Sequence, residues 1–229
     1  MTGGLPLIVT RPEPGNRATV ARATALGLDP HAMPLFAARA IAWSAPEPRD
    51  FGALLLTSAH AVRLAGPQLA GLASLPVHAV GAATAAAAAA AGLNVVATGD
   101  NGVQRLLDGM TSDNNGRILW LCGQDRTQFE ARGAGLEPRV CYAVDPVRPP
   151  PAWSSLIAAP AVLLAHSVRA SERIAALVGR ARAHLLLVAI SPAAAAAARG
   201  GWAELAVPPH PADASMLALA QALCHKGGK

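Results

Sequence analysis

Aromatic and charged residues are both scarce in this chain of 229 residues. Aromatic side chains make up 3% of it and charged side chains 14%, whereas 52% of the residues are hydrophobic. This composition predicts a packed globular protein, long enough for one large or two small domains, and excludes a disordered one. The few aromatic stacking platforms and the scattered arginines argue against a nucleic-acid partner. The formal net charge of +5 still favours an anionic partner such as a phosphate or a polycarboxylate.

Cysteines are few and lack the spacing of metal ligands. Cys122, Cys141 and Cys224 are an odd number with no Cys-x-x-Cys or Cys/His pattern, which argues against a disulfide framework and structural zinc. The first residues lack the regions of a signal peptide, and no apolar run reaches the roughly 20 residues of a membrane span. We therefore expect a cytoplasmic protein with no metal site and no membrane segment.

Common catalytic and nucleotide-binding motifs are also absent. The sequence has no Gly-x-Gly-x-x-Gly after its first predicted strand, no P-loop, no His-Glu-x-x-His and no Gly-x-Ser-x-Gly. The seven histidines are dispersed, and no pair of carboxylates indicates general acid–base catalysis. Asp213 is predicted to cap the last helix.

The most informative feature is an internal repeat. Residues 51–66 resemble residues 160–175, and residues 77–93 resemble residues 187–202. Ser58 corresponds to Ser167 at an offset of 109 residues, and the openings of the two halves also correspond. The repeat predicts two similar halves of about 109 residues each.

Each half alternates apolar runs with helical segments. The predicted strands are 6–10, 52–57, 77–80, 94–97, 117–121, 161–165, 185–190 and 204–207, with a further strand at 139–141. The predicted helices are about 15–26, 59–71, 82–91, 103–110, 125–134, 168–183, 192–199 and 213–225. Many strands are Val/Ile/Leu-rich with little alternation, which indicates burial on both faces. The predicted fold class is α/β, with two similar domains built on parallel sheets.

Proline clusters divide the chain into these domains. The segments 38–50 and 142–153 are rich in proline, which neither a helix nor a central strand tolerates, so we interpret them as linkers. We expect one domain from residues 1–37 and 147–229. The other is expected to span 38–146, including linkers near 38–50 and 140–152.

Small and hydroxyl-bearing residues follow several predicted strands. They are Ser58, Gly81, Thr84, Ser167 and Ser191. Parallel α/β sheets bind ligands beyond the carboxyl ends of their strands, where helix N-termini attract anions. The alternative interpretation is that these hydroxyls are only helix caps. Together they indicate an anion-binding cleft between the two domains.

Arginines and one tyrosine complete the candidate site. Arg11 follows the first strand, and Arg126 occupies the equivalent loop of the second half, where a guanidinium can bind a carboxylate or phosphate bidentately. Arg169 lies at the start of a helix. Tyr142, the only tyrosine, follows the strand 139–141 and is predicted to assist a leaving group. The alternatives are solvated surface arginines and a tyrosine packed at a hinge.

Taken together, these segments resemble the uroporphyrinogen-III synthase family. The matching segments are IVTRP (8–12), LLLTSAHAV (54–62), HAVGAATAAAAAAAGL (78–93), GLEPRVCYAV (135–144), AVLLAHSVRA (161–170) and VAISPAAAAAARGGW (188–202). The resemblance spans about residues 5–223 in the family's order. It implies two α/β domains joined by a two-stranded linker, with the first strand and helix in the C-terminal half.

The resemblance also implies a reaction that needs no cofactor. In this family hydroxymethylbilane, a linear tetrapyrrole with eight carboxylates, loses water through an azafulvene and closes through a spiro-pyrrolenine, which inverts ring D. The resemblance implies that Tyr142 assists loss of the hydroxyl and that Ser58, Thr84 and Ser167 lie in substrate-binding loops. Arg11 matches the arginine of the opening motif, whose role in the family is open between structure and binding. His60 stands where asparagine is common, and Ala193 and Ala194 stand where some members carry a hydroxyl.

Other functions remain open from the sequence. The chain could be a non-catalytic two-domain module that binds an anionic small molecule, a flavin carrier, or a synthase that has lost activity. As partners we expect the substrate and a transient contact with the upstream bilane synthase, with no nucleic acid and no membrane. We expect a monomer.

Overall fold

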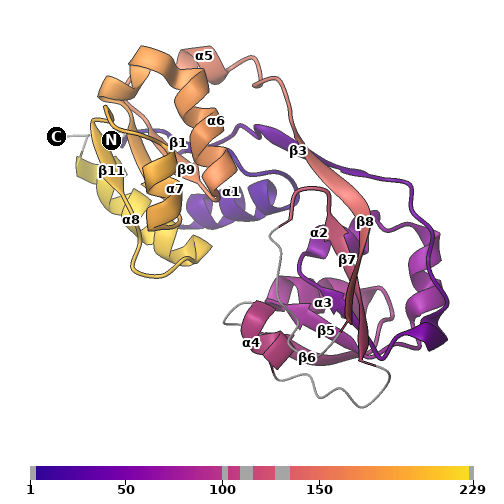
Figure 1. Ribbon diagram of the computed structural model, residues 1–229. Coiled ribbons are helices and arrows are strands. Elements are labelled where there is room, and N and C mark those ends of the chain that lie inside the picture. Colours follow the sequence, from indigo (N-terminus) through magenta and orange to yellow (C-terminus); the bar gives the residue numbers. More distant parts are fainter. Residues whose placement is uncertain (1–3, 100–102, 109–115, 127–134, 227–229) are drawn as a thin grey trace. The chain divides into compact units, whose positions relative to one another are not determined.

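The chain forms two compact α/β units. This computed structural model describes residues 4–99, 103–108, 116–126 and 135–226. Unit 1 consists of Met1–Ala37 with Pro146–Lys229, and unit 2 of Ala38–Asp145. Figure 1 shows the helices and strands along the chain. No helix within the described ranges is both long and apolar enough to cross a membrane.

Unit 1 is built on a five-stranded parallel sheet. Its strands lie in the order β11 (Glu204–Ala206), β10 (Leu186–Ala189), β9 (Val162–Ala165), β1 (Leu7–Val9) and β2 (Pro30–Ala32). Its helices are α1 (Gly15–Ala25), α5 (Trp153–Leu156), α6 (Val168–Val178), α7 (Pro192–Ala197) and α8 (Asp213–Lys226), with a 3-10 helix η3 (Gly179–His184). The central strands are fully buried, because helices cover both faces of such a sheet.

Unit 2 repeats this order and adds one strand. Its sheet runs β3 (Phe36–Ala40), β8 (Gly135–Pro146), β7 (Arg117–Gly123), β4 (Ala53–Leu56), β5 (Val77–Val80) and β6 (Val95–Gly99). The pairs from β8 to β6 are all parallel. Its helices are α2 (Ala59–Leu64), α3 (Ala82–Ala90) and α4 (Val103–Asp108), with 3-10 helices η1 (Pro48–Asp50) and η2 (Pro67–Leu72).

The internal repeat corresponds to this shared strand order. In the strand order, β4 and β5 of unit 2 hold the same places as β9 and β10 of unit 1. β7 lies next to β4, and β1 lies next to β9. Gly92 and Gly201 both have a positive φ, 78° and 92°, in the turn before β6 and β11. The α/β class with two similar, mainly parallel sheets is therefore confirmed.

The chain passes between the units through two neighbouring strands. The division between the units falls inside β3 and at the end of β8. The sequence predicted linkers near 38–50 and 140–152 with a short strand at 139–141, and the structure extends that strand to the 12 residues of β8, which include Pro138. The backbone N–H of Ile41, just after β3, donates to the carbonyl of Cys141. Pro138 therefore lies beyond the end of β3, on the open side of β8, where the missing N–H of a proline is tolerated.

Several predicted helices are shorter than expected because glycines interrupt them. The segment 59–71 divides at Gly66 (φ 78°) and Pro67 into α2 and η2, and α6 ends before Gly179 (φ 52°). The strand β2 and the helix α5 were not predicted. Most of the helix predicted at 125–134, and residues 109–110 of another, lie outside the described residues.

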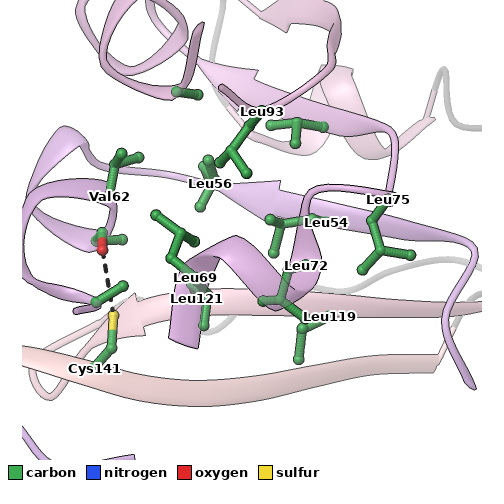
Figure 2. Packing of buried hydrophobic residues seen from close by; sticks show 14 of the residues in the cluster. Leu54, Leu56, Val62, Leu69, Leu72, Leu75, Leu93, Leu119, Leu121 and Cys141 are labelled. Carbon is green, nitrogen blue, oxygen red and sulfur yellow. Dashed lines mark hydrogen bonds between the residues drawn. The ribbon is translucent and has the colours of Figure 1, made fainter. Parts of the chain in front are cut away.

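The core of unit 2 lies on both faces of β4 and β7. Leu54 and Leu56 pack with Leu119 and Leu121 under η2 (Figure 2). Leu55 points to the opposite face and packs with other residues of the unit. This double burial explains the run of apolar residues without alternation.

Candidate active site

Most of the predicted site residues lie just after the carboxyl ends of parallel strands. In unit 1 these are Arg11 after β1, Ser167 after β9 and Ser191 after β10. In unit 2 they are Ser58 after β4, Gly81 and Thr84 after β5, and Arg126 after β7. Since parallel strands end at the same edge, each unit collects its own candidates at one edge of its own sheet.

The three serines act as helix caps. The hydroxyl oxygen of Ser58 accepts from the backbone N–H of His60 at 3.2 Å, that of Ser167 from Ala170 at 3.1 Å, and that of Ser191 from Ala194 at 3.2 Å. All three serines therefore cap helices, and this does not exclude a further role in ligand binding. Capping uses the oxygen only as an acceptor, so each hydroxyl can still donate its hydrogen to a carboxylate.

Gly81 and Thr84 begin α3. Gly81 has a φ of 83°, a backbone conformation that residues with a side chain rarely adopt. Its N–H donates to the carbonyl of Gly99. The N–H of Thr84 donates to the carbonyl of Gly81, and its side chain is buried. Thr84 therefore belongs to the packed base of this turn.

Tyr142 lies on a β-bulge of β8, level with the carboxyl end of the neighbouring strand β7. Cys122 pairs with Val140 and Gly123 pairs with Tyr142, so Cys141 is the extra residue. The Cys141 thiol donates to the carbonyl of Ala61 in α2 at 3.8 Å (Figure 2). Adjacent residues of a regular strand point to opposite faces of the sheet. Because of the bulge, Cys141 and Tyr142 instead pack in the same apolar cluster.

Among the described residues, Gly123, His60 and Ser58 lie near the Tyr142 phenol. A Cβ added to Gly123 would lie 2.8 Å from Cζ and 3.0 Å from the hydroxyl oxygen of Tyr142. The ring of His60 lies 5.7 Å from the tyrosine ring, centroid to centroid, at 42°. Burial raises the pKa of Tyr142, and a hydrogen bond with Ser58 opposes part of that rise. The phenol therefore stays protonated at neutral pH.

Arg11 has a partner that the sequence did not indicate. Its Nη1 donates to Asp213 Oδ1 at 3.2 Å and to the Thr19 hydroxyl at 3.3 Å. Its guanidinium covers Gly15, where a Cβ would lie 2.5 Å from Nε. The Arg11 side chain remains 31% exposed, so a ligand could still reach the rest of the guanidinium.

Asp213 is the centre of a charged network in unit 1. Its carboxylate also accepts from Thr19 Oγ1 at 2.7 Å, contacts Nε2 of His166 at 2.8 Å, and accepts from Arg22 Nη2 at 2.7 Å. Burial would raise the pKa of Asp213, but the bonds from His166, Thr19 and Arg22 hold it below its usual range. Burial lowers the pKa of His166, although its bond to Asp213 works in the other direction. Sequence reasoning gave Asp213 only a capping role, because its partners are up to 202 residues away.

The other candidate arginines contact aromatic rings. The guanidinium of Arg126 lies 5.9 Å from the ring of Trp120, whose Nε1 donates to the Thr57 hydroxyl at 3.0 Å. Arg169 lies 5.3 Å from the ring of Phe36. At such distances a cation is attracted to the ring face.

A family comparison covers most of the chain. Residues 17–218 match the family described as uroporphyrinogen-III synthase HemD. A comparison with curated protein sequences found no significant match.

Solved structures share the fold. The uroporphyrinogen-III synthetase of Helicobacter pylori matches with a TM-score of 0.66 at 15% identity, over 96% of this chain and 99% of that one. A mutant uroporphyrinogen III synthase of Thermus thermophilus matches with a TM-score of 0.52 at 18% identity, over 97% and 99%. At such identities the structural likeness establishes the fold alone, whereas the family match compares the amino-acid sequence itself over residues 17–218. The chain therefore belongs to the uroporphyrinogen-III synthase family, cyclising lyases of tetrapyrrole biosynthesis.

Proposed function

We propose that this chain closes hydroxymethylbilane into uroporphyrinogen III with inversion of ring D, at a site centred on Tyr142. The observation that carries the proposal is the position of the Tyr142 phenol, level with the carboxyl end of β7, against Gly123 and beside the ring of His60 in the first turn of α2. A protonated hydroxyl beside helix N-termini suits a reaction in which a hydroxide leaves from a polyanionic substrate.

In the proposed first step the phenol of Tyr142 donates its proton to the hydroxymethyl oxygen as the C–O bond breaks. The electron pair of the pyrrole nitrogen forms the new C=N bond, water leaves, and the pyrrole N–H proton returns to the phenolate. The azafulvene carbon is then attacked by the substituted carbon of ring D. As its carbon is attacked, the azafulvene nitrogen takes up a proton. The resulting spiro-pyrrolenine fragments, recombines with ring D inverted, and releases one proton, so that the cyclisation is neutral overall.

The remaining candidates are proposed to hold the substrate. Ser167 and Ser191 can each donate a hydroxyl hydrogen to a carboxylate while their oxygens cap α6 and α7. Arg11, Arg126, Gly81 and Thr84 are the other proposed substrate-binding residues. Because the free substrate also cyclises without rearrangement, the main task of such contacts is to hold the geometry that favours one closure.

The decisive test of the function is isomer identity. Hydroxymethylbilane is generated with its upstream synthase, this protein is added, and the oxidised products are separated into uroporphyrin I and III. We expect isomer III to dominate in proportion to the protein added. Isomer I alone would contradict the proposal and favour a module that binds the anionic substrate without converting it.

We also propose that the protein works as a cytoplasmic monomer and contacts the upstream bilane synthase transiently. All three cysteines are free and buried, which supports a reducing compartment. Light scattering coupled to size-exclusion chromatography tests the oligomeric state, and the same measurement with the upstream enzyme added tests the contact.

A further inference from the structure

The Tyr142 phenol occupies a space left by the absence of a side chain. Gly123 stands opposite Tyr142 on the neighbouring strand, and its Cβ would meet the phenol at 2.8–3.0 Å. This is closer than side-chain carbons normally approach, and the atoms concerned are the stiff end of an aromatic ring. Glycine is thus required here for space, as it has no positive φ at this position.

The ring of His60 bounds the same phenol from α2. It lies in the first turn of α2, two residues after Ser58, whose hydroxyl oxygen accepts from the His60 N–H. The tilted ring contact with Tyr142 has the separation of a favourable aromatic pair. A side chain without a ring at this position cannot make this contact.

We propose that Gly123 and His60 are positioning residues, which together place the Tyr142 hydroxyl for the reaction. Gly123 leaves the room that the hydroxyl occupies, and His60 packs against the ring from the helix side. This inference rests on the proposed function of Tyr142. The inference goes beyond that function because it assigns the placement of the phenol to two residues that do not themselves react.

The single tyrosine makes this placement measurable without an activity assay. Phenolate absorbance at 295 nm, or a single ¹³Cζ tyrosine signal, reports the titration of Tyr142 alone, since the chain has 1 tyrosine. Burial raises the pKa of Tyr142 in the folded protein. Displacing the ring toward solvent is expected to return it toward about 10.

The experiment compares two pairs of variants. Gly123→Ala is matched by Gly71→Ala, where an added Cβ has nothing within 4 Å. His60→Ala is matched by His60→Phe, which keeps a ring. We expect Gly123→Ala and His60→Ala to lower the phenol pKa and to reduce kcat for isomer III about tenfold, with little change in KM. Gly71→Ala and His60→Phe are expected to keep both properties close to the wild type.

The outcomes separate the two proposals. Wild-type kcat in both Gly123→Ala and His60→Ala would overturn the positioning role, whatever the titration shows. If Gly123→Ala does not fold, the His60 pair decides the same question. A slow Tyr142→Phe variant alongside unaffected positioning variants would leave the proposed function intact. A fully active Tyr142→Phe variant would remove the proposed role of Tyr142 itself.

Discussion

The two units share a strand order but differ in chemistry at the carboxyl edges of their sheets. In unit 1 this edge holds the carboxylate of Asp213, bonded to Thr19, Arg11, Arg22 and His166. In unit 2 it holds a neutral phenol beside a serine hydroxyl. A repeated fold therefore does not repeat its chemistry, because function depends on the side chains placed at the edge and not on the strand order.

The largest expected effect is loss of the unit 1 network. Asp213→Asn leaves Arg11 and Arg22 near each other without a counter-charge, and we expect the free energy of unfolding of unit 1 to fall by about 2 kcal/mol. Hydrogen exchange resolved by peptide should show lost protection in unit 1 and little change in unit 2.

Asp145→Asn is the matched control for this variant. Asp145 pairs with Arg39, and both side chains are about half exposed, so the expected loss is at most about 1 kcal/mol. Equal losses of unfolding free energy in the two variants would contradict the larger stabilising role assigned to Asp213.

Acid is expected to weaken unit 1 in two steps. The pKa of His166 is lowered in the folded protein, so the unfolded chain binds more protons and stability begins to fall as the pH drops below about 6.5. The pKa of Asp213 is also lowered, so its contribution is present above about pH 4 and is lost below that value.

Thermal midpoints measured from pH 7 to 3 test this expectation. His166→Asn should flatten the upper part of the curve, whereas His225→Asn, at the exposed end of α8, should not. An identical slope in the His166 variant would exclude this histidine as the cause.

The equivalent serines of the two units should separate capping from catalysis. Ser58→Ala and Ser167→Ala each remove one N-cap, and each is expected to cost about 1 kcal/mol of stability. Ser58 interacts with the Tyr142 hydroxyl and lowers its pKa, whereas Ser167 caps a helix of the other unit. Ser58→Ala should therefore lower kcat severalfold, whereas Ser167→Ala should mainly raise KM. Steady-state kinetics with the isomer assay distinguishes these patterns, and equal effects on kcat would contradict the assignment.

Much of the fold could be predicted from the sequence. The runs at Leu54–Leu56 and 162–165 are buried on both faces and repeat at one offset, which was enough to predict two similar parallel sheets. The capping serines could also be predicted, since a hydroxyl directly before a helical segment has a local signature. Only the part of β8 at 139–141 could be predicted, because the tolerance of Pro138 in the longer strand depends on where β3 ends.

The site was less predictable because its contacts are not local. Tyr142 was singled out, but the bulge at Cys141 and the space over Gly123 depend on pairing between β7 and β8. Asp213 meets Thr19 across 194 residues, and no sequence pattern indicates such a contact. A glycine required for space, without a positive φ, also leaves no local signal.

The central claim is most directly tested by single-turnover kinetics of Tyr142→Phe. This change removes one oxygen and keeps the ring over Gly123, so the thermal midpoint should change little. If the phenol supplies the proton for loss of water, the rate of isomer III formation should fall about tenfold or more, with isomer I rising in compensation. A wild-type rate of isomer III formation in this variant would contradict the account.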